Sequence, residues 1–283
     1  MTAVLQTDLR QPERVDGAAR IVFARRHGCT RLEDLYQRAP CRVLFPDTEV
    51  DDPAMAALLT TSGGLTGGDR LEVSVAVKDN ATATITTQAA ERIYRSNDGV
   101  STINVALEVG AGAWVEWLMQ ETILFDGANL SRRIEADVSP TGRLLAVESL
   151  VFGRAAMGES FRRGYLLDRW RIRLGGRLAW LDALKLGGDV AGQRALPFGL
   201  GNSAGCATLI YAGADARSWI DAARAAIADG GAAGGASSFD GLLVARLYAG
   251  SASVLREAVA RCVRRLRSEI AGLPSRMPRL WSI

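Results

Sequence analysis

Short alternations of apolar and polar residues recur along the chain from about residue 20 to residue 186. The clearest segments with this period of two are 71–77, 82–86 and 103–109. β-Branched and aromatic residues also gather in later runs, at 114–118, 144–151, 170–174 and 178–184. Such alternation gives a strand one buried face, so these segments predict strands separated by turns at Gly, Asp and Pro. Strands without intervening helices favour a sandwich, a barrel or stacked sheets, although no exact repeat period marks a regular β-helix.

The last quarter of the chain mixes strand and helix patterns. Strands are predicted over 206–211 and 242–248, and the glycine-rich stretch between them, 230–238, is expected to be a loop. A helix is predicted over 217–228, with Asp215 in position to cap its first turn. This portion therefore predicts a β-α-β-α unit that ends in a second helix.

That final helix is expected over 254–271, because its apolar residues return at helical spacing. Its arginines fall mostly elsewhere around the helix, which predicts a solvated face or a protein-docking surface. The whole pattern predicts a mainly β protein, with a β-rich body over 1–204 and a C-terminal α+β portion over 205–283. We expect the two parts to pack as one continuous structural unit.

Composition narrows the class of protein. The chain has 283 residues, of which 48% are apolar and 23% charged, so it can bury a sizeable core and is not expected to be disordered. It has no run of ~20 apolar residues, so no membrane-spanning helix is predicted. No secretion signal is evident in the first 20 residues, and four dispersed cysteines suit a reducing compartment. We therefore expect a cytoplasmic protein.

The formal net charge is only +3, but eight arginines and two glutamates lie between residues 241 and 283. Nucleic-acid modules usually carry a broader basic surface with aromatic residues among the arginines. A helix with basic residues on one side, in a nearly neutral chain, favours contact with water or protein instead. No nucleic acid is expected as a partner.

Two glycine motifs suggest chemistry that their surroundings exclude. Residues 201–205 match G-x-S-x-G, but a nucleophilic serine needs a preceding strand, a following helix and a later histidine, and the only histidine lies upstream. Residues 63–69 read GGLTGGD, without the Gly-Lys-Ser/Thr of a phosphate loop and with a strand after them. A tight backbone crossing, at which only glycine fits, explains the second motif better.

His27 is the only histidine, and Cys29 stands one residue away from it. On a strand both side chains would point the same way, and imidazole and thiolate are good ligands for divalent transition metals. The alternative is a structural histidine near a thiol. Without a further His or Cys cluster, a zinc site of the usual kind is not predicted.

Five carboxylates lie among apolar residues in strand-like segments: Glu116, Glu121, Asp126, Glu148 and Glu159. Paired carboxylates could serve a glycosidase as acid and base. They could equally face outward from the strands, or line a polar path for a cation. The residue pattern leaves these three interpretations open.

The order of motifs is more specific than any one of them. The blocks are TTSGGLTGGD (60–69), TTQAAERIYRS (86–96), WLMQETILFDGA (117–128), GRAAMGE (153–159) and PRLW (278–281), preceded by GCTRL (28–32). In this order and at these separations, the blocks resemble the urease accessory protein family UreD, also called UreH. Two departures stand out: Glu91 replaces a common lysine, and Met119 replaces the usual proline.

This resemblance implies a maturation chaperone and not an enzyme. Members of the family bind urease apoprotein and the helical protein UreF, through which they recruit the GTPase UreG for nickel delivery. The resemblance also implies an elongated fold of stacked, helically arranged sheets with few helices. It implies no tightly bound cofactor, and a nickel ion only in transit. The rival class is an all-β, carboxylate-dependent enzyme that acts on glycans.

A protein that passes nickel on should hold it weakly, so scarce imidazoles and scattered carboxylates suit a conduit. We expect Asp69 and Glu148, with Glu121, Asp126 or Glu159, to line a polar path, and His27 and Cys29 to be optional ligands. For docking to UreF or urease we expect Arg92, Tyr94, Arg95, Arg279 and Trp281, because Tyr, Trp and Arg are enriched at binding hot spots. The alternative for these residues is internal packing, and Trp281 could anchor the terminus.

Overall fold

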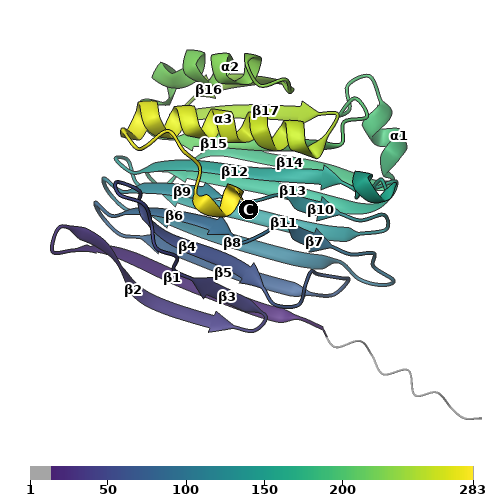
Figure 1. Ribbon diagram of the computed structural model, residues 1–283, viewed down its shortest axis with the longest axis horizontal. Coiled ribbons are helices and arrows are strands. Elements are labelled where there is room, and N and C mark those ends of the chain that lie inside the picture. Colours follow the sequence, from purple (N-terminus) through teal and green to yellow (C-terminus); the bar gives the residue numbers. More distant parts are fainter. Residues whose placement is uncertain (1–13, 283) are drawn as a thin grey trace, which may run out of the picture.

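Two β-sheets lie face to face in the computed structural model, which describes residues 14–282 (Figure 1). The seven-stranded sheet has the order β14-β13-β11-β8-β5-β1-β2, built from β1 (Asp16–Arg26), β2 (Cys29–Arg38), β5 (Arg70–Val77), β8 (Ser101–Val109), β11 (Asn129–Val138), β13 (Arg163–Leu174) and β14 (Arg177–Asp189). The ten-stranded sheet has the order β16-β17-β15-β12-β9-β6-β4-β3, and two short strands branch from it: β10 pairs with β12, and β7 pairs with β10. Its strands are β3 (Cys41–Leu44), β4 (Ala54–Thr60), β6 (Thr82–Thr87), β7 (Glu91–Ile93), β9 (Trp114–Leu118), β10 (Thr122–Leu124), β12 (Arg143–Phe152), β15 (Gly205–Ala212), β16 (Ala233–Phe239) and β17 (Leu242–Ala249).

Between β4 and β13 the chain winds back and forth between the two sheets, so successive coils stack in parallel. Val73 lies opposite Val105, and Val105 lies opposite Ile134, so these partners are 32 and 29 residues apart. The next coil is longer, because Ile134 pairs with Trp170, 36 residues on. The prediction of stacked sheets is confirmed, and the unequal coil lengths explain why the sequence shows no exact repeat.

The inward halves of the alternating segments form the core between the sheets. It includes Ile21, Val75 and Leu107 of the seven-stranded sheet and Ile85 and Ala146 of the ten-stranded sheet, all buried. Burial of this apolar surface is the main favourable term in folding, at about 25 cal/mol per Å². The period-two prediction therefore identified the buried face correctly.

Within residues 14–282, three α-helices complete the fold: α1 (Val190–Ala195), α2 (Ile220–Ala228) and α3 (Ala252–Ala271). Helices α2 and α3 cover the outer face of the ten-stranded sheet and form a second apolar core with it (Figure 1). That sheet continues into the C-terminal portion, because β15 pairs antiparallel with β12. Among residues 14–282, no helix combines the length and apolar character needed to cross a membrane.

Two local predictions in the C-terminal portion are wrong. The stretch 230–238 contains a strand, β16, because backbone hydrogen bonds to β17 compensate for the lack of apolar alternation. Asp215 does not cap a helix: its carboxylate accepts hydrogen bonds from Tyr211 Oη (2.6 Å) and Trp219 Nε1 (3.0 Å), and α2 begins only at Ile220 after a 3-10 turn.

Helix α3 also departs in part from its predicted solvated face. Arg264 and Arg265 behave as expected and pair with Glu257 and Glu269 at the surface. Arg267, however, is only 2% exposed, and its Nε lies 2.9 Å from Oε1 of the fully buried Glu116 of β9. A buried ion pair therefore fastens the helix to the sheet.

We expect Arg267→Ala to lower the free energy of unfolding by about 3–5 kcal/mol, because it leaves the Glu116 carboxylate buried without its partner. Arg265→Ala is the matched control on the same helix and should change it by less than about 1 kcal/mol, because that pair is exposed. Urea denaturation measures both values. Equal effects of the two variants would contradict the assignment.

Candidate functional site

Parts of four of the six motif blocks stack beside one another at one edge of the coils. Leu65 forms a β-bridge with Ile93, and the backbone N–H of Tyr94 donates to Leu65 O at 2.7 Å. One coil further on, Arg95 forms a bridge with Ala128. We call this set of stacked loops, residues 63–69, 94–99, 125–128 and 153–163, the motif ridge. Segments far apart in sequence therefore form one surface.

Aromatic and glycine residues fix the shape of the motif ridge. The hydroxyl of Tyr94 donates to Gly63 O at 2.8 Å, and its ring packs edge-on against Phe125, with centroids 4.9 Å apart. A Cβ at Gly67 would lie 1.9 Å from the carbonyl oxygen of Asp98, so no larger residue fits there. The interpretation of residues 63–69 as a tight backbone crossing is confirmed.

Three of the expected path carboxylates belong to this ridge. Asp69 accepts hydrogen bonds from the backbone N–H groups of Val15 and Thr66, at 2.8 and 2.7 Å, and so organises the glycine loop. Asp126 pairs with Arg162, and Glu159 pairs with Arg154.

The surroundings of Asp126 favour its charged form. Partial burial opposes ionisation, but hydrogen bonds from the backbone N–H groups of Arg163 and Arg162 lower the pKa of Asp126 below its ordinary value. Its two carboxylate oxygens are already used by these donors and by the Arg162 side chain. Asp126 is therefore an ionised and fully engaged group of the ridge.

Glu121 lies elsewhere, beneath the C-terminal segment. Its carboxylate pairs with Arg256 of α3 at 2.7 Å, and the Arg256 guanidinium packs over the Trp281 ring, 4.9 Å from its centroid. Trp281 is buried, and its Nε1 donates to Thr86 Oγ1 at 3.1 Å, so this side chain anchors the end of the chain. Arg279 is largely exposed and pairs with Glu49 at 3.3 Å.

His27 and Cys29 lie at the tip of the hairpin between β1 and β2. Positive φ angles at His27 (51°) and Gly28 (83°) form the turn, and Arg26 pairs with Cys29 across it. The expectation that both side chains share one side of a strand is wrong, because His27 is in the turn. Within residues 14–282, no group of three or more His, Cys, Asp or Glu side chains is arranged to hold a metal ion.

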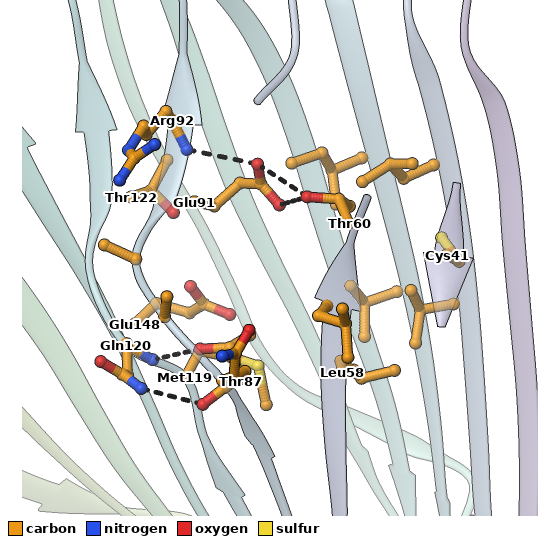
Figure 2. A pocket seen from close by; sticks show the side chains of 18 of the residues that line it. Cys41, Leu58, Thr60, Thr87, Glu91, Arg92, Met119, Gln120, Thr122 and Glu148 are labelled. Atoms are coloured by element: carbon orange, nitrogen blue, oxygen red, sulfur yellow. Dashed lines mark hydrogen bonds between the residues drawn. The ribbon is translucent and has the colours of Figure 1, made fainter. Parts of the chain in front are cut away.

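A cavity of about 190 Å³ opens between the sheets where β4 and β7 separate (Figure 2). Strand β4 pairs with β6 as far as Leu58, whereas β7 pairs only with β10. The split is bridged by side chains, because Thr60 Oγ1 donates to Glu91 Oε2 at 3.0 Å. We call Thr60, Glu91 and the exposed Arg92 the mouth of the cavity.

Burial at the mouth acts on Glu91. It raises the pKa of the Glu91 carboxyl above its ordinary value, although hydrogen bonds from Thr60 and from the Arg92 backbone oppose the rise. Both departures from the family pattern, Glu91 and Met119, line this cavity. The cavity lining is thus where this chain differs from the pattern that it resembles.

The floor of the cavity is formed by Glu148 and Arg132, which are 4% and 3% exposed. Glu148 accepts a hydrogen bond from Trp117 Nε1 at 2.8 Å and another from Arg132 Nη1. Arg132 also binds both carboxylate oxygens of Asp168, at 2.8 and 2.9 Å, and Thr122 Oγ1 at 3.1 Å. Burial raises the pKa of Glu148, and the positive charge of Arg132 opposes that rise.

Of the expected path residues, only Glu148 lines the cavity; the structure does not gather the others around it. Sequence reasoning missed Arg132, Asp168 and Glu91 as site residues. A signal existed for the first two, because each stands at an inward position of an alternating strand, between Leu130 and Ile134 or between Leu166 and Trp170. Charged residues at the inward-facing positions of a strand indicate a buried ionic cluster.

The fold and the site together define a two-sheet β-solenoid with helices over one face, an internal ionic cluster and a ridge of stacked loops. The family model described as UreD urease accessory protein matches residues 15–282, and the chain belongs to this family. It is 41% identical to urease accessory protein UreD of Magnetococcus marinus, with 99% of each chain covered. It is 44% identical to the protein of that name from Methylobacterium sp. (strain 4-46), with 90% of this chain and 89% of the relative covered. Membership in this family supports a role in urease maturation.

Thiol reactivity checks the environment of the cavity. Burial and the nearby Glu91 charge raise the pKa of the Cys41 thiol to about 11, so very little of it is thiolate at pH 8. We expect iodoacetamide at pH 8 to modify the exposed Cys29 first and Cys41 far more slowly, as read by mass spectrometry. Glu91→Gln should accelerate modification of Cys41, because loss of the negative charge lowers the thiol pKa. Equal rates for Cys29 and Cys41 in the native protein would refute the assignment.

Proposed function

We propose that this chain is a non-enzymatic chaperone of urease maturation in the cytoplasm. It binds urease apoprotein and, with UreF and the GTPase UreG, supports insertion of nickel into the urease active site. Its family membership and the naming of its relatives as urease accessory proteins support this proposal. Nickel is cargo in this scheme and not a resident cofactor.

The cavity supports the further proposal that the chain conducts the nickel ion. It places Glu91 at a partly exposed mouth and Glu148 at a buried floor, with space between the sheets that connects them. Two carboxylates in a mainly apolar space attract a divalent cation without the several imidazoles or thiolates that would retain it. This arrangement suits transfer and release better than storage.

The other predicted path residues take different parts in this proposal. Asp69, Asp126 and Glu159 hold the motif ridge in shape, and Glu121 holds the C-terminal segment. They affect nickel transfer through the surfaces that they support. The path proper passes Glu91 and Glu148.

The glycan-active alternative receives no support from the geometry of its carboxylates. Glu148, Glu121 and Glu159 form ion pairs with Arg132, Arg256 and Arg154, respectively. These three carboxylates lie in separate places, namely the cavity, the C-terminal segment and the motif ridge, whereas a glycosidase needs two carboxylates that flank one groove. We expect no turnover of glycans by the isolated chain.

Glu91→Gln and Glu148→Gln test the conduit. Each removes one negative charge from the cavity at nearly constant volume, so we expect the nickel content of co-expressed urease to fall several-fold while the complex with UreF still assembles. Nickel per urease active site is measured by atomic absorption after purification. Glu108→Gln, an exposed carboxylate on the seven-stranded sheet, is the matched control and should leave nickel content unchanged. Full nickel loading with both cavity variants would argue against a conduit.

Arg92 and Arg95 test docking. Both are exposed, Arg92 on β7 at the mouth of the cavity and Arg95 on the adjoining loop of the motif ridge, so Arg92→Ala with Arg95→Ala should weaken capture of the UreF homologue or of urease at least several-fold. Arg20→Ala, an exposed arginine of β1, is the control and should bind normally. Titration by light-scattering or calorimetry gives the dissociation constant, and an unchanged constant in the double variant removes these arginines from the interface. Trp281 is unsuited to this test because its loss would also release the chain end.

A further inference from the structure

Arg132 connects the two sheets at the inner end of the cavity. It belongs to β11 of the seven-stranded sheet and reaches Thr122 and Glu148, which belong to the ten-stranded sheet. On its own sheet it binds Asp168 of the neighbouring strand β13. One guanidinium is therefore shared between a carboxylate on each sheet.

The two carboxylates hold this guanidinium unequally. Asp168 receives two N–H donors in a bidentate pair, through Nε and Nη2, whereas Glu148 receives only Nη1. Bidentate pairs of this kind are the stronger ones. Glu148 also keeps a second donor, Trp117 Nε1, if Arg132 turns away. Glu148 is thus the partner that Arg132 gives up more easily.

Arg132 also obstructs a cation. Both Arg132 and Glu148 line the cavity, so an ion that reaches the floor meets the carboxylate and the guanidinium together. The cation and the guanidinium are both positive and repel each other, and this repulsion is poorly screened in a buried site. The ion can bind Glu148 only in exchange for Arg132.

Further ionisable groups lie near Arg132. Cys206 is half-buried, and the charges of Asp168, Arg132 and Arg246 act on the pKa of its thiol. Arg246 in turn pairs with Asp182 at 2.6 Å, and it lines a surface hollow of about 410 Å³ together with Trp180 and Tyr248. Arg132 therefore lines the cavity and also acts electrostatically on Cys206, which lies outside the cavity lining.

We infer that Arg132 is a positioning residue that closes the inner end of the cavity and opens it by exchange. A divalent cation takes Glu148 from Arg132, while Asp168 retains the guanidinium on the seven-stranded sheet. The exchange replaces one ion pair by another and requires no covalent step. The inference rests on the proposed conduit for the direction of movement, but the exchange itself can be measured without urease.

The indole N–H of Trp117 reports on Glu148 directly. In the full-length chain labelled with ¹⁵N-tryptophan, its resonance is assigned with Trp117→Phe, and Ni²⁺, which is paramagnetic, is added stepwise. We expect Ni²⁺ to broaden this resonance in the wild type and not in Glu148→Gln. The half-broadening concentration is the Ni²⁺ concentration at which the Trp117 resonance has lost half of its intensity. In Arg132→Gln it should fall about tenfold, because the ion no longer competes with a buried guanidinium.

A second variant controls for loss of folding in Arg132→Gln. Arg132→Gln with Asp168→Asn removes one positive and one negative charge, so the net charge of the three-residue cluster stays the same. It should show the same fall in half-broadening concentration, whereas the surface control Arg20→Gln should match the wild type. A half-broadening concentration equal to wild type in the folded double variant overturns the inference, as does broadening that persists in Glu148→Gln.

Urease maturation separates this inference from the proposed function. If the Arg132 variants shift the Ni²⁺ titration but Glu91→Gln and Glu148→Gln still load urease fully, the exchange is real and the conduit is wrong. If the carboxylate variants lower nickel content while the Arg132 variants leave the Ni²⁺ titration unchanged, the conduit stands and the exchange is wrong.

Discussion

Backbone hydrogen bonding between successive coils is the constraint on which the rest of the structure depends. Most strands between β4 and β13 satisfy their N–H and C=O groups on the coils before and after them, which fixes residues about one coil apart as neighbours. Parts of four motif blocks form one ridge for this reason. The same register aligns Arg132 with Asp168 on adjacent strands.

Two buried ionic clusters join the apolar layers of the fold to one another. Arg267 and Glu116 join α3 to the sheet on its outer side, whereas Arg132, Glu148 and Asp168 join the sheets to each other on the inner side. Both clusters are buried, so each depends on complete pairing. Two members of the inner cluster, Arg132 and Glu148, line the cavity between the sheets, which is why the proposed exchange with an ion is placed there.

Much of the fold was predictable from local pattern, because alternation reports the buried face of each strand directly. Strand β16 and the pairing of coils were not predictable, since glycine and serine carry no alternation and the unequal coils conceal the repeat. Among site residues, Glu148 was singled out because it is a carboxylate among apolar residues of a strand-like segment, and it lines the cavity. Arg132 was missed because its partners lie 16 and 36 residues away, a separation that only the coil register brings together.

The central claim is that this chain is needed to place nickel in urease. Co-expression of the urease subunits and the remaining accessory proteins, with and without this chain, measures that need directly. Purified urease should be nickel-loaded and active with the chain present, and assembled but largely free of nickel and inactive without it. Urease that carries the same nickel content and activity in both preparations would contradict the account.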